Sequence, residues 1–263
     1  MRRLLLVALV ACATRPPLVP SEDSRIARIE ENLTPPVVIE GRGAGRPLPE
    51  RMAHHGVAGV SLAVLDEGRP VWARAYGSLS ETAPLPTAGL GLDLPPQATP
   101  TEIAAALAKL PRTGAQMRRE TRRGLVIFDP ARGQGAVVLT DAETDGAAPL
   151  VAEILRAIAA EYGWPGYPGP TVKKTITVPA ERLADYSGTY QLGGGVTVDI
   201  AVTGERLTIA TPDGAVAELY PEAPDRFFLL ERDAVVQFVR DPAGNVTALT
   251  AYIEGRQIQA PRR

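Results

Sequence analysis

The chain has 263 residues, enough for one or two domains that each bury a core. Hydrophobic residues make up 45% and charged residues 22% of it, as in ordinary globular proteins. The net charge of −2 excludes the strongly basic surface typical of nucleic-acid-binding proteins, so we expect no nucleic-acid partner.

The N-terminus has the pattern of an export signal, because Arg2 and Arg3 precede the apolar run 4–11. That run is too short to span a bilayer, which takes about 20 residues. Residues 9–12 (LVAC) resemble a lipoprotein signal, so we predict a signal segment over 1–12 and lipidation of Cys12. We therefore expect a periplasmic or outer-membrane lipoprotein, tethered to the membrane through Cys12. The alternative is plain secretion after cleavage near residues 11–13.

Residues 21–163 are predicted to form a first domain of mixed helices and strands. Short helices are expected at 21–33 and 48–56, and further helices at 101–110 and 148–161. Strands are expected at 59–65, 70–76, 125–129 and 135–141, whereas 78–100 is rich in proline and glycine and should be irregular. We expect one antiparallel sheet with the last helix on one face. The other face is then exposed or covered by helix 101–110.

Residues 164–178 are predicted to be a linker, and residues 179–263 a second, all-β domain. Short strands recur every 8–12 residues there, which predicts an antiparallel sandwich or small barrel. They are expected around 188–192, 196–202, 206–211, 215–220, 226–231, 235–240, 246–252 and 256–260. Tyr186, Tyr190, Phe227 and Phe228 are interpreted as core residues, not as a ligand site. Together with Leu230, Phe238 and Tyr252, among others, they should plug the interior.

Several blocks of the chain, in order, resemble the serine β-lactamase-like, penicillin-binding-protein-like hydrolases. These are residues 35–42 (PPVVIEGR), 50–77 (ERMAHHG to RAYG), 132–146 (RGQGAVVLTDAETDG) and 153–165 (EILRAIAAEYGWP). The segments 182–192 and 225–258 are similar to the lipocalin-like domain that follows some members. The resemblance implies an α+β fold, in which a truncated β-lactamase-like antiparallel sheet with flanking helices precedes an all-β lipocalin-like barrel. It also implies that residues 54–77 carry no chemistry.

The catalytic motifs that this resemblance implies are missing. A serine should precede a lysine by three positions, but Ala106, Pro170 and Thr171 precede the three lysines. Thr171 lies in the predicted linker, and no tyrosine has an asparagine two positions later. We therefore predict no catalytic residue, with the catalytic insert lost between residues 77 and 124.

Three further patterns resemble active-site motifs only in part. Residues 54–56 (HHG) fit His-x-Gly but end a helix before the sheet, and 112–114 (RTG) follows a helix instead of lying in a strand. Ser61 lies inside a strand, whereas a nucleophile elbow needs a strand-to-helix turn. The alternative hypothesis is an active hydrolase that uses Ser61 or Ser78 as an unrecognised nucleophile.

We predict no metal site and no cofactor. His54 and His55 are the only histidines, Cys12 is the only cysteine, and adjacent helical residues point about 100° apart. The sequence thus predicts an exported, catalytically inactive member of the hydrolase family, acting as a binding or scaffold module of the cell envelope. Peptidoglycan or a small molecule would be its ligand. The alternative is an active esterase, β-lactamase or D-peptidase.

Overall fold

The structure is a computed structural model that describes residues 21–263, apart from residues 81, 83, 122, 143–146, 168, 213 and 254. The side chains of residues 85 and 121 are likewise outside the description. The predicted signal segment 1–12 and its lipidated Cys12 lie outside the described residues. No helix in the described part of the chain is both long enough and apolar enough to cross a membrane.

The N-terminal half is built on a five-stranded antiparallel sheet in the order β3-β2-β8-β7-β6. Its strands are β2 (Gly59–Asp66), β3 (Arg69–Gly77), β6 (Met117–Thr121), β7 (Gly124–Asp129) and β8 (Gln134–Thr140). The two expected strand pairs are confirmed and join through β2 and β8. The edge strand β6 was not expected, because its sequence MRRET is charged and lacks an apolar face. Charged side chains are common on edge strands, where they discourage pairing with another chain.

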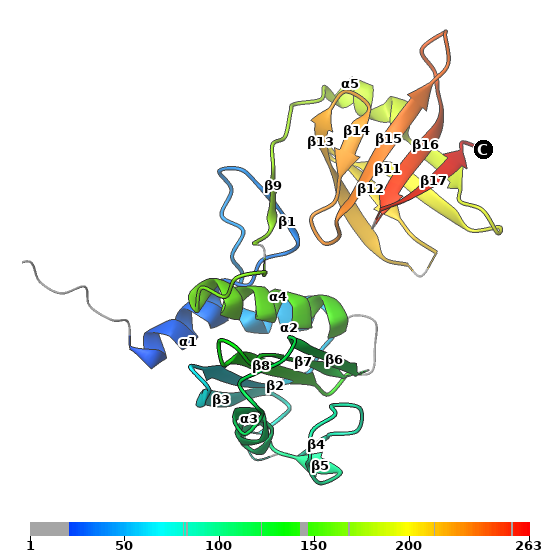
Figure 1. The fold of residues 1–263 in the computed structure, drawn as a ribbon. Coiled ribbons are helices and arrows are strands. Elements are labelled where there is room, and N and C mark those ends of the chain that lie inside the picture. The colour runs from blue at the N-terminus through cyan, green and yellow to red at the C-terminus, as the bar shows by residue number, and fades with distance from the viewer. Residues whose placement is uncertain are drawn as a thin grey trace, which may run out of the picture.

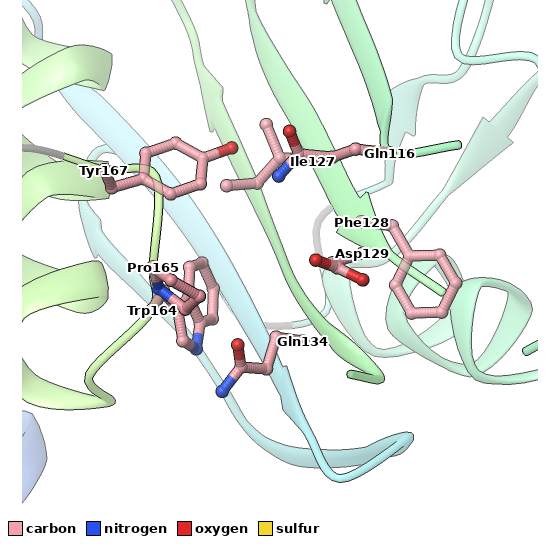
Figure 2. Close-up of a pocket in the computed structure, with 8 residues that line it drawn as sticks. All are labelled: Gln116, Ile127, Phe128, Asp129, Gln134, Trp164, Pro165 and Tyr167. Carbon is pink, nitrogen blue, oxygen red and sulfur yellow. The ribbon is translucent and has the colours of Figure 1, made fainter. Parts of the chain in front are cut away.

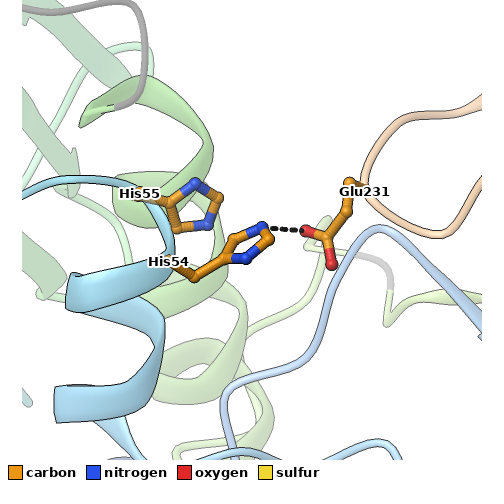
Figure 3. A group of neighbouring side chains, drawn as sticks. All are labelled: His54, His55 and Glu231. Carbon is orange, nitrogen blue, oxygen red and sulfur yellow. Dashed lines mark ion pairs between the residues drawn. The ribbon is translucent and has the colours of Figure 1, made fainter. Parts of the chain in front are cut away.

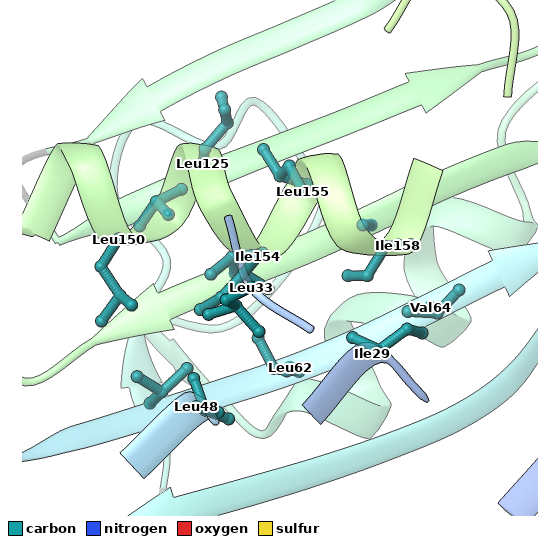
Figure 4. Close-up of a cluster of buried hydrophobic side chains, with 14 of the residues drawn as sticks. Ile29, Leu33, Leu48, Leu62, Val64, Leu125, Leu150, Ile154, Leu155 and Ile158 are labelled. Carbon is teal, nitrogen blue, oxygen red and sulfur yellow. The ribbon is translucent and has the colours of Figure 1, made fainter. Parts of the chain in front are cut away.

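Helices cover both faces of this sheet (Figure 1). On one face lie α1 (Glu22–Glu31), α2 (Leu48–His54) and α4 (Ala147–Glu161), and on the other lies α3 (Pro100–Ala108). Figure 4 shows the first face, where Leu150, Ile154 and Ile158 of α4 pack over Leu62 and Val64 of β2. Because both faces are buried, the central strands are almost continuously apolar. We call this sheet and its four helices the sheet unit.

The helix α3 covers the second face of the sheet. The sequence leaves open whether this face is exposed or covered by that helix. Its start is fixed by a capping box, in which Thr99 and Glu102 each satisfy the other's backbone N–H. Its Ile103 and Leu107 pack on Ala63 and Leu65 of β2. The preceding irregular region contains a short ladder of β4 (Leu85–Pro86) and β5 (Gln97–Ala98).

The predicted linker is partly a strand. Within it, β9 (Thr171–Lys173) pairs in parallel with β1 (Val37–Ile39). This two-stranded ribbon lies between the sheet unit and the C-terminal half (Figure 1). Val37 and Ile39 pack there against Phe228 and Val235, which belong to the C-terminal half. The prolines and glycines of residues 164–170 predict a linker, and they give no sign of β9, whose partner strand lies far away in the sequence.

The C-terminal half is a nearly closed barrel of eight antiparallel strands in sequence order, preceded by α5 (Ala180–Leu183) and the 3-10 turn η1 (Ala184–Tyr186). A bridge between Tyr190 and Arg262 brings the first and last strands together. The strands confirm the expected series: β10 (Gly188–Gln191), β11 (Thr197–Thr203), β12 (Arg206–Ala210), β13 (Val216–Ala223), β14 (Arg226–Phe228), β15 (Ala234–Arg240), β16 (Val246–Ile253) and β17 (Arg256–Pro261).

Aromatic rings fill one end of the barrel interior. Tyr186, Tyr190 and Phe227 surround Phe238, with ring centroids 4.6 to 5.8 Å from it. The Tyr190 hydroxyl donates a hydrogen bond of 2.7 Å to the Tyr186 carbonyl oxygen, and the Tyr186 hydroxyl donates one of 2.9 Å to Asp225 Oδ1, so both phenol groups are satisfied. The interior is thus plugged by side chains, as expected.

Three residues assigned to that plug lie elsewhere. Phe228 and Leu230 belong to the cluster with β1, because neighbouring residues of a strand point to opposite faces and Phe227 takes the inner one. Tyr252 is 40% exposed on the outer wall of the barrel. There its ring lies under the Arg226 guanidinium, 5.7 Å from ring centroid to Cζ.

The packed interior predicts that a fatty acid such as oleate leaves the melting temperature of the whole chain unchanged, measured by differential scanning fluorimetry. The variant Phe238→Ala, which removes the central ring, should lose about 3–5 kcal/mol of stability. A rise of several degrees with oleate in the unaltered chain would show that the barrel is a ligand carrier.

Candidate functional site

Five ionisable side chains gather where the sheet unit meets the barrel. Arg51, His54 and His55 come from the end of α2, Glu153 from α4, and Glu231 from the loop between β14 and β15. We call these five residues the junction cluster. Figure 3 shows the two histidines at the end of α2 and Glu231 facing them from the barrel.

Arg51 is the centre of the cluster and binds a carboxylate from each side. Its Nε and Nη2 donate to the two oxygens of Glu153 at 2.7 and 2.6 Å. Its Nη1 and Nη2 donate to the two oxygens of Glu231 at 3.2 and 2.6 Å. The two bidentate pairs use four of the five N–H groups of the guanidinium. The guanidinium therefore links the sheet unit to the barrel directly.

Burial keeps water away from the pair of Arg51 and Glu153. The side chains of Arg51 and Glu153 are 7% and 1% exposed, whereas that of Glu231 is 38% exposed. Burial alone would raise the pKa of Glu153, but hydrogen bonds from His55 and Arg51 outweigh it and hold that pKa below its usual range. Burial alone would lower the pKa of Arg51, but its hydrogen bonds to Glu153 and Glu231 outweigh burial and raise that pKa above its ordinary value. Both groups are charged at neutral pH.

The two histidines flank this pairing. His55 Nε2 lies 3.0 Å from Glu153 Oε1 and 3.1 Å from Arg51 Nη2. That nitrogen donates to the carboxylate if it carries the proton, or accepts from the guanidinium if it does not. His54 Nε2 lies 3.3 Å from Glu231 Oε2. The two rings meet edge to face with centroids 4.8 Å apart.

The local sequence explains how α2 presents these groups. Leu48 and Met52 bury one side of the helix in the core, which turns Arg51 and His55, one turn apart, toward α4. The helix ends at His54, and Gly56 follows with a positive φ of 65°, a conformation that glycine adopts without strain. His55 is therefore the residue at which the chain leaves the helix.

Sequence reasoning named the histidines but missed their partners. Glu153 gave a readable signal, because it lies three positions after Leu150 and so on the apolar face of α4, where a carboxylate needs a buried partner. Arg51 and Glu231 gave no local signal, since their contact joins segments that are distant in the sequence.

The two serines proposed as alternative nucleophiles differ in their surroundings, and neither has a histidine or lysine as a hydrogen-bond partner among the described residues. Ser61 is 1% exposed in the middle of β2, and its Oγ has no hydrogen-bond partner among the described residues. Ser78 Oγ donates to Asp141 Oδ2 at 2.5 Å, while Asp141 Oδ1 accepts from the Gly59 N–H at 2.8 Å. Asp141 therefore ties together the ends of β2 and β3.

The remaining motif residues have structural partners too. Lys173 and Lys174 pair with Glu222 and Glu40 at 2.7 and 3.4 Å. Thr171 lies in strand β9, where it pairs with Val37. It is therefore not on a helix, where a hydroxyl group and a lysine three positions later would lie one turn apart. The triplet 112–114 lies in the loop before β6.

Arg112 packs across two hairpin turns. A methyl group at Gly68 would lie 1.7 Å from its Nη1, and one at Gly133 would lie 2.1 Å from it. The guanidinium thus fills the space that side chains at these turns would need, which is a packing role.

Two hollows lie on the sheet unit. The first, between β7 and residues 164–167, has a volume of about 10 Å³, the space of a single water molecule, and Figure 2 shows Trp164, Tyr167 and Asp129 at its walls. The second is an open groove of about 490 Å³ between the outer side of α3 and the loop 91–95, with Glu102 and Lys109 at its rim. Of these two hollows, the groove is the one large enough for a ligand.

The comparisons with known proteins give one family match and weak structural likenesses. A family described as a domain of unknown function (DUF3471) matches residues 172–261, which is the barrel with its leading strand. No curated protein matches the sequence of this chain.

Three solved structures show how weak the likenesses are. SurE with D-Leu is 20% identical over 56% of this chain and 35% of its own, with a TM-score of 0.31. SurE in a second structure is 16% identical over 63% and 43%, with a TM-score of 0.28. The octameric penicillin-binding protein homologue from Pyrococcus abyssi is 11% identical over 81% and 98%, with a TM-score of 0.32. This chain thus spans less than half the length of SurE, and TM-scores near 0.3 carry nothing about its activity.

Removing the arginine of the junction cluster should be costly, because it leaves Glu153 buried beside an imidazole alone. We expect Arg51→Met to lower the free energy of unfolding by about 3–5 kcal/mol, and Arg51→Met/Glu153→Leu to regain most of that loss. Urea denaturation followed by the fluorescence of Trp72 and Trp164 measures both.

The matched control is Arg46→Met, which breaks an exposed pair with Glu50 at 3.4 Å and should cost about 1 kcal/mol or less. Equal decreases in the free energy of unfolding for Arg51→Met and Arg46→Met would contradict a stabilising role for the buried ion pairs of Arg51.

Proposed function

We propose that this chain is an exported, catalytically inactive relative of the serine β-lactamase-like, penicillin-binding-protein-like hydrolases. In this proposal its sheet unit is the truncated hydrolase domain, and its barrel is a lipocalin-like domain. Cys12 anchors it to the membrane as a periplasmic or outer-membrane lipoprotein. It acts as a binding or scaffold module of the envelope.

The observation that carries this proposal is the surroundings of the hydroxyl groups. A serine hydrolase needs a base within about 2.6–3.2 Å of its nucleophile to remove the proton. Among the described residues, Ser61 Oγ is buried without a hydrogen-bond partner, and Ser78 Oγ donates to a carboxylate. Both histidines are engaged in the junction cluster, and Lys173 and Lys174 pair with acids. These surroundings support the proposal that the described residues hold no activated nucleophile for acyl transfer.

The covering of the sheet agrees with a truncated hydrolase domain. The helix α3 buries Ile103, Ala104 and Leu107 on the face of the sheet opposite α4. In the proposal, this one helix takes the place of the larger catalytic insert. The apolar face of the sheet is thereby covered, so the sheet unit can fold without the catalytic insert.

The binding part of the proposal rests on the groove beside α3. Its volume of about 490 Å³ lies within the range of small-molecule sites, about 300–1,000 Å³. Leu92, Leu94 and Leu110 offer apolar contact. Asp93 and Glu102 offer two negative charges, and Lys109 offers one positive charge. A peptidoglycan fragment or another small polar molecule with an apolar part fits this lining.

One observation favours the alternative of an active hydrolase. Ser78 stands directly after β3, and its hydroxyl is exposed and already hydrogen-bonded to Asp141. The other oxygen of Asp141 accepts a hydrogen bond of 2.8 Å from the Gly59 N–H, so this carboxylate joins the ends of β2 and β3. This contact therefore supports a structural tie more than a catalytic pair.

Covalent labelling tests the proposal directly. The whole chain is treated with a fluorescent penicillin and, separately, with a fluorescent fluorophosphonate, and adducts are sought by gel and by mass spectrometry. We expect no adduct with either probe, because Ser61 is buried without a hydrogen-bond partner and Ser78 is held by an aspartate that joins two strands. Ser78→Ala and Ser61→Ala serve as the matched variants. A stoichiometric adduct that disappears in one of them would establish the active-hydrolase alternative and name its nucleophile.

A further inference from the structure

We propose that His54, His55 and Glu231 form a binding site for a divalent zinc-type ion that bridges the sheet unit and the barrel. The site is separate from the proposed function and does not depend on it. It departs from the sequence-based expectation of no metal site, because its third ligand comes from the barrel.

The three side chains converge closely enough for one ion. Their ligand atoms all lie within 4.8 Å of one another, before any ion draws them together. A tetrahedral zinc ion with bonds of about 2.0–2.2 Å holds its ligand atoms about 3.4 Å apart. His54 Nε2 and Glu231 Oε2 are already at 3.3 Å, so this pair has the spacing that a shared ion requires. The remaining atoms need to move by little more than 1 Å, which a change of side-chain torsion supplies.

Two of the ligands are free to make that movement. The side chains of His54 and Glu231 are 47% and 38% exposed, and Figure 3 shows the ion pair between them. His55 is 8% exposed and anchored on the inner side by Glu153. One fixed ligand and two adjustable ones leave the fourth position open to solvent, where a water molecule completes the coordination.

The charges of the junction cluster permit a dication. Arg51 brings one positive charge, and Glu153 and Glu231 bring two negative charges, so these groups carry a net −1 with neutral imidazoles. Arg156, which interacts electrostatically with Arg51 and Glu153, adds one positive charge beside the cluster. Glu153 binds Arg51 through both of its oxygens and offsets its charge at close range. The second carboxylate, Glu231, is then the surplus negative group, and it is the one that faces the histidines.

Arg51 also positions that ligand. It donates to both oxygens of Glu231, yet each carboxylate oxygen has a second lone pair for another partner. Ligating carboxylates are commonly held in this way by a hydrogen bond from behind. The choice of ion follows from the donors, since two imidazoles and one carboxylate suit zinc better than calcium or magnesium, which prefer oxygen alone.

Binding is measured with ZnCl2 alone on the whole chain, made without a histidine tag and as Cys12→Ser, so that neither a tag nor the thiol binds the metal. Isothermal titration gives stoichiometry and affinity, and the absorption of the Co²⁺-loaded chain reports the geometry. We expect one ion per chain, four-coordinate Co²⁺ bands, and a melting temperature that rises with zinc.

The variants His54→Ala and Glu231→Gln should each weaken zinc binding at least tenfold and abolish the thermal shift. Both replace side chains that are more than a third exposed, so far-ultraviolet circular dichroism should show an unchanged fold. Asp233→Asn, in the same loop but outside the junction cluster, is the matched control and should bind as the parent does. Absence of zinc binding in the parent, or equal affinity in the His54 and Glu231 variants, would overturn the proposal.

Discussion

The guanidinium of Arg51 holds one carboxylate from the sheet unit and one from the barrel, and the arrangement of the two halves depends on it. Taking a charge pair out of water is costly, so it persists only where hydrogen bonds satisfy the groups fully. Here Arg51 makes two bidentate pairs, with Glu153 inside and Glu231 at the rim. The apolar contacts of Val37 and Ile39 with Phe228 lie beside it and exclude water from the same junction.

Around this junction, both halves are closed. The sheet has helices on both faces, and the barrel is filled by Tyr186, Tyr190, Phe227 and Phe238. Ser61 lies buried within β2, and Ser78 ties the end of β3 to Asp141. The groove beside α3 and the histidine-bearing rim of the junction cluster lie at the surface, and these are the two places to which we assign binding.

Local patterns in the sequence predict most of the helices and strands. The elements that these patterns do not predict depend on contacts between distant segments. The eight barrel strands followed from regular turns, and α4 from its apolar stripe. The edge strand β6 was hidden by its charged sequence, and the ribbon of β1 and β9 by its short strands and distant pairing. At the site, His54 and His55 were visible as motif residues. Their partners Arg51 and Glu231 meet only in the folded chain, so no local pattern connects them.

Arg51 is expected to hold the barrel against the sheet unit through Glu231. Small-angle X-ray scattering of the variant Glu231→Lys tests this directly. The substitution sets a lysine against Arg51 at a side chain that is 38% exposed, so each half keeps its own core. We expect the parent chain to scatter as this structure does, and the variant to show a larger radius of gyration because the halves separate. Identical scattering curves for parent and variant, or a parent curve that requires separated halves, would contradict the account.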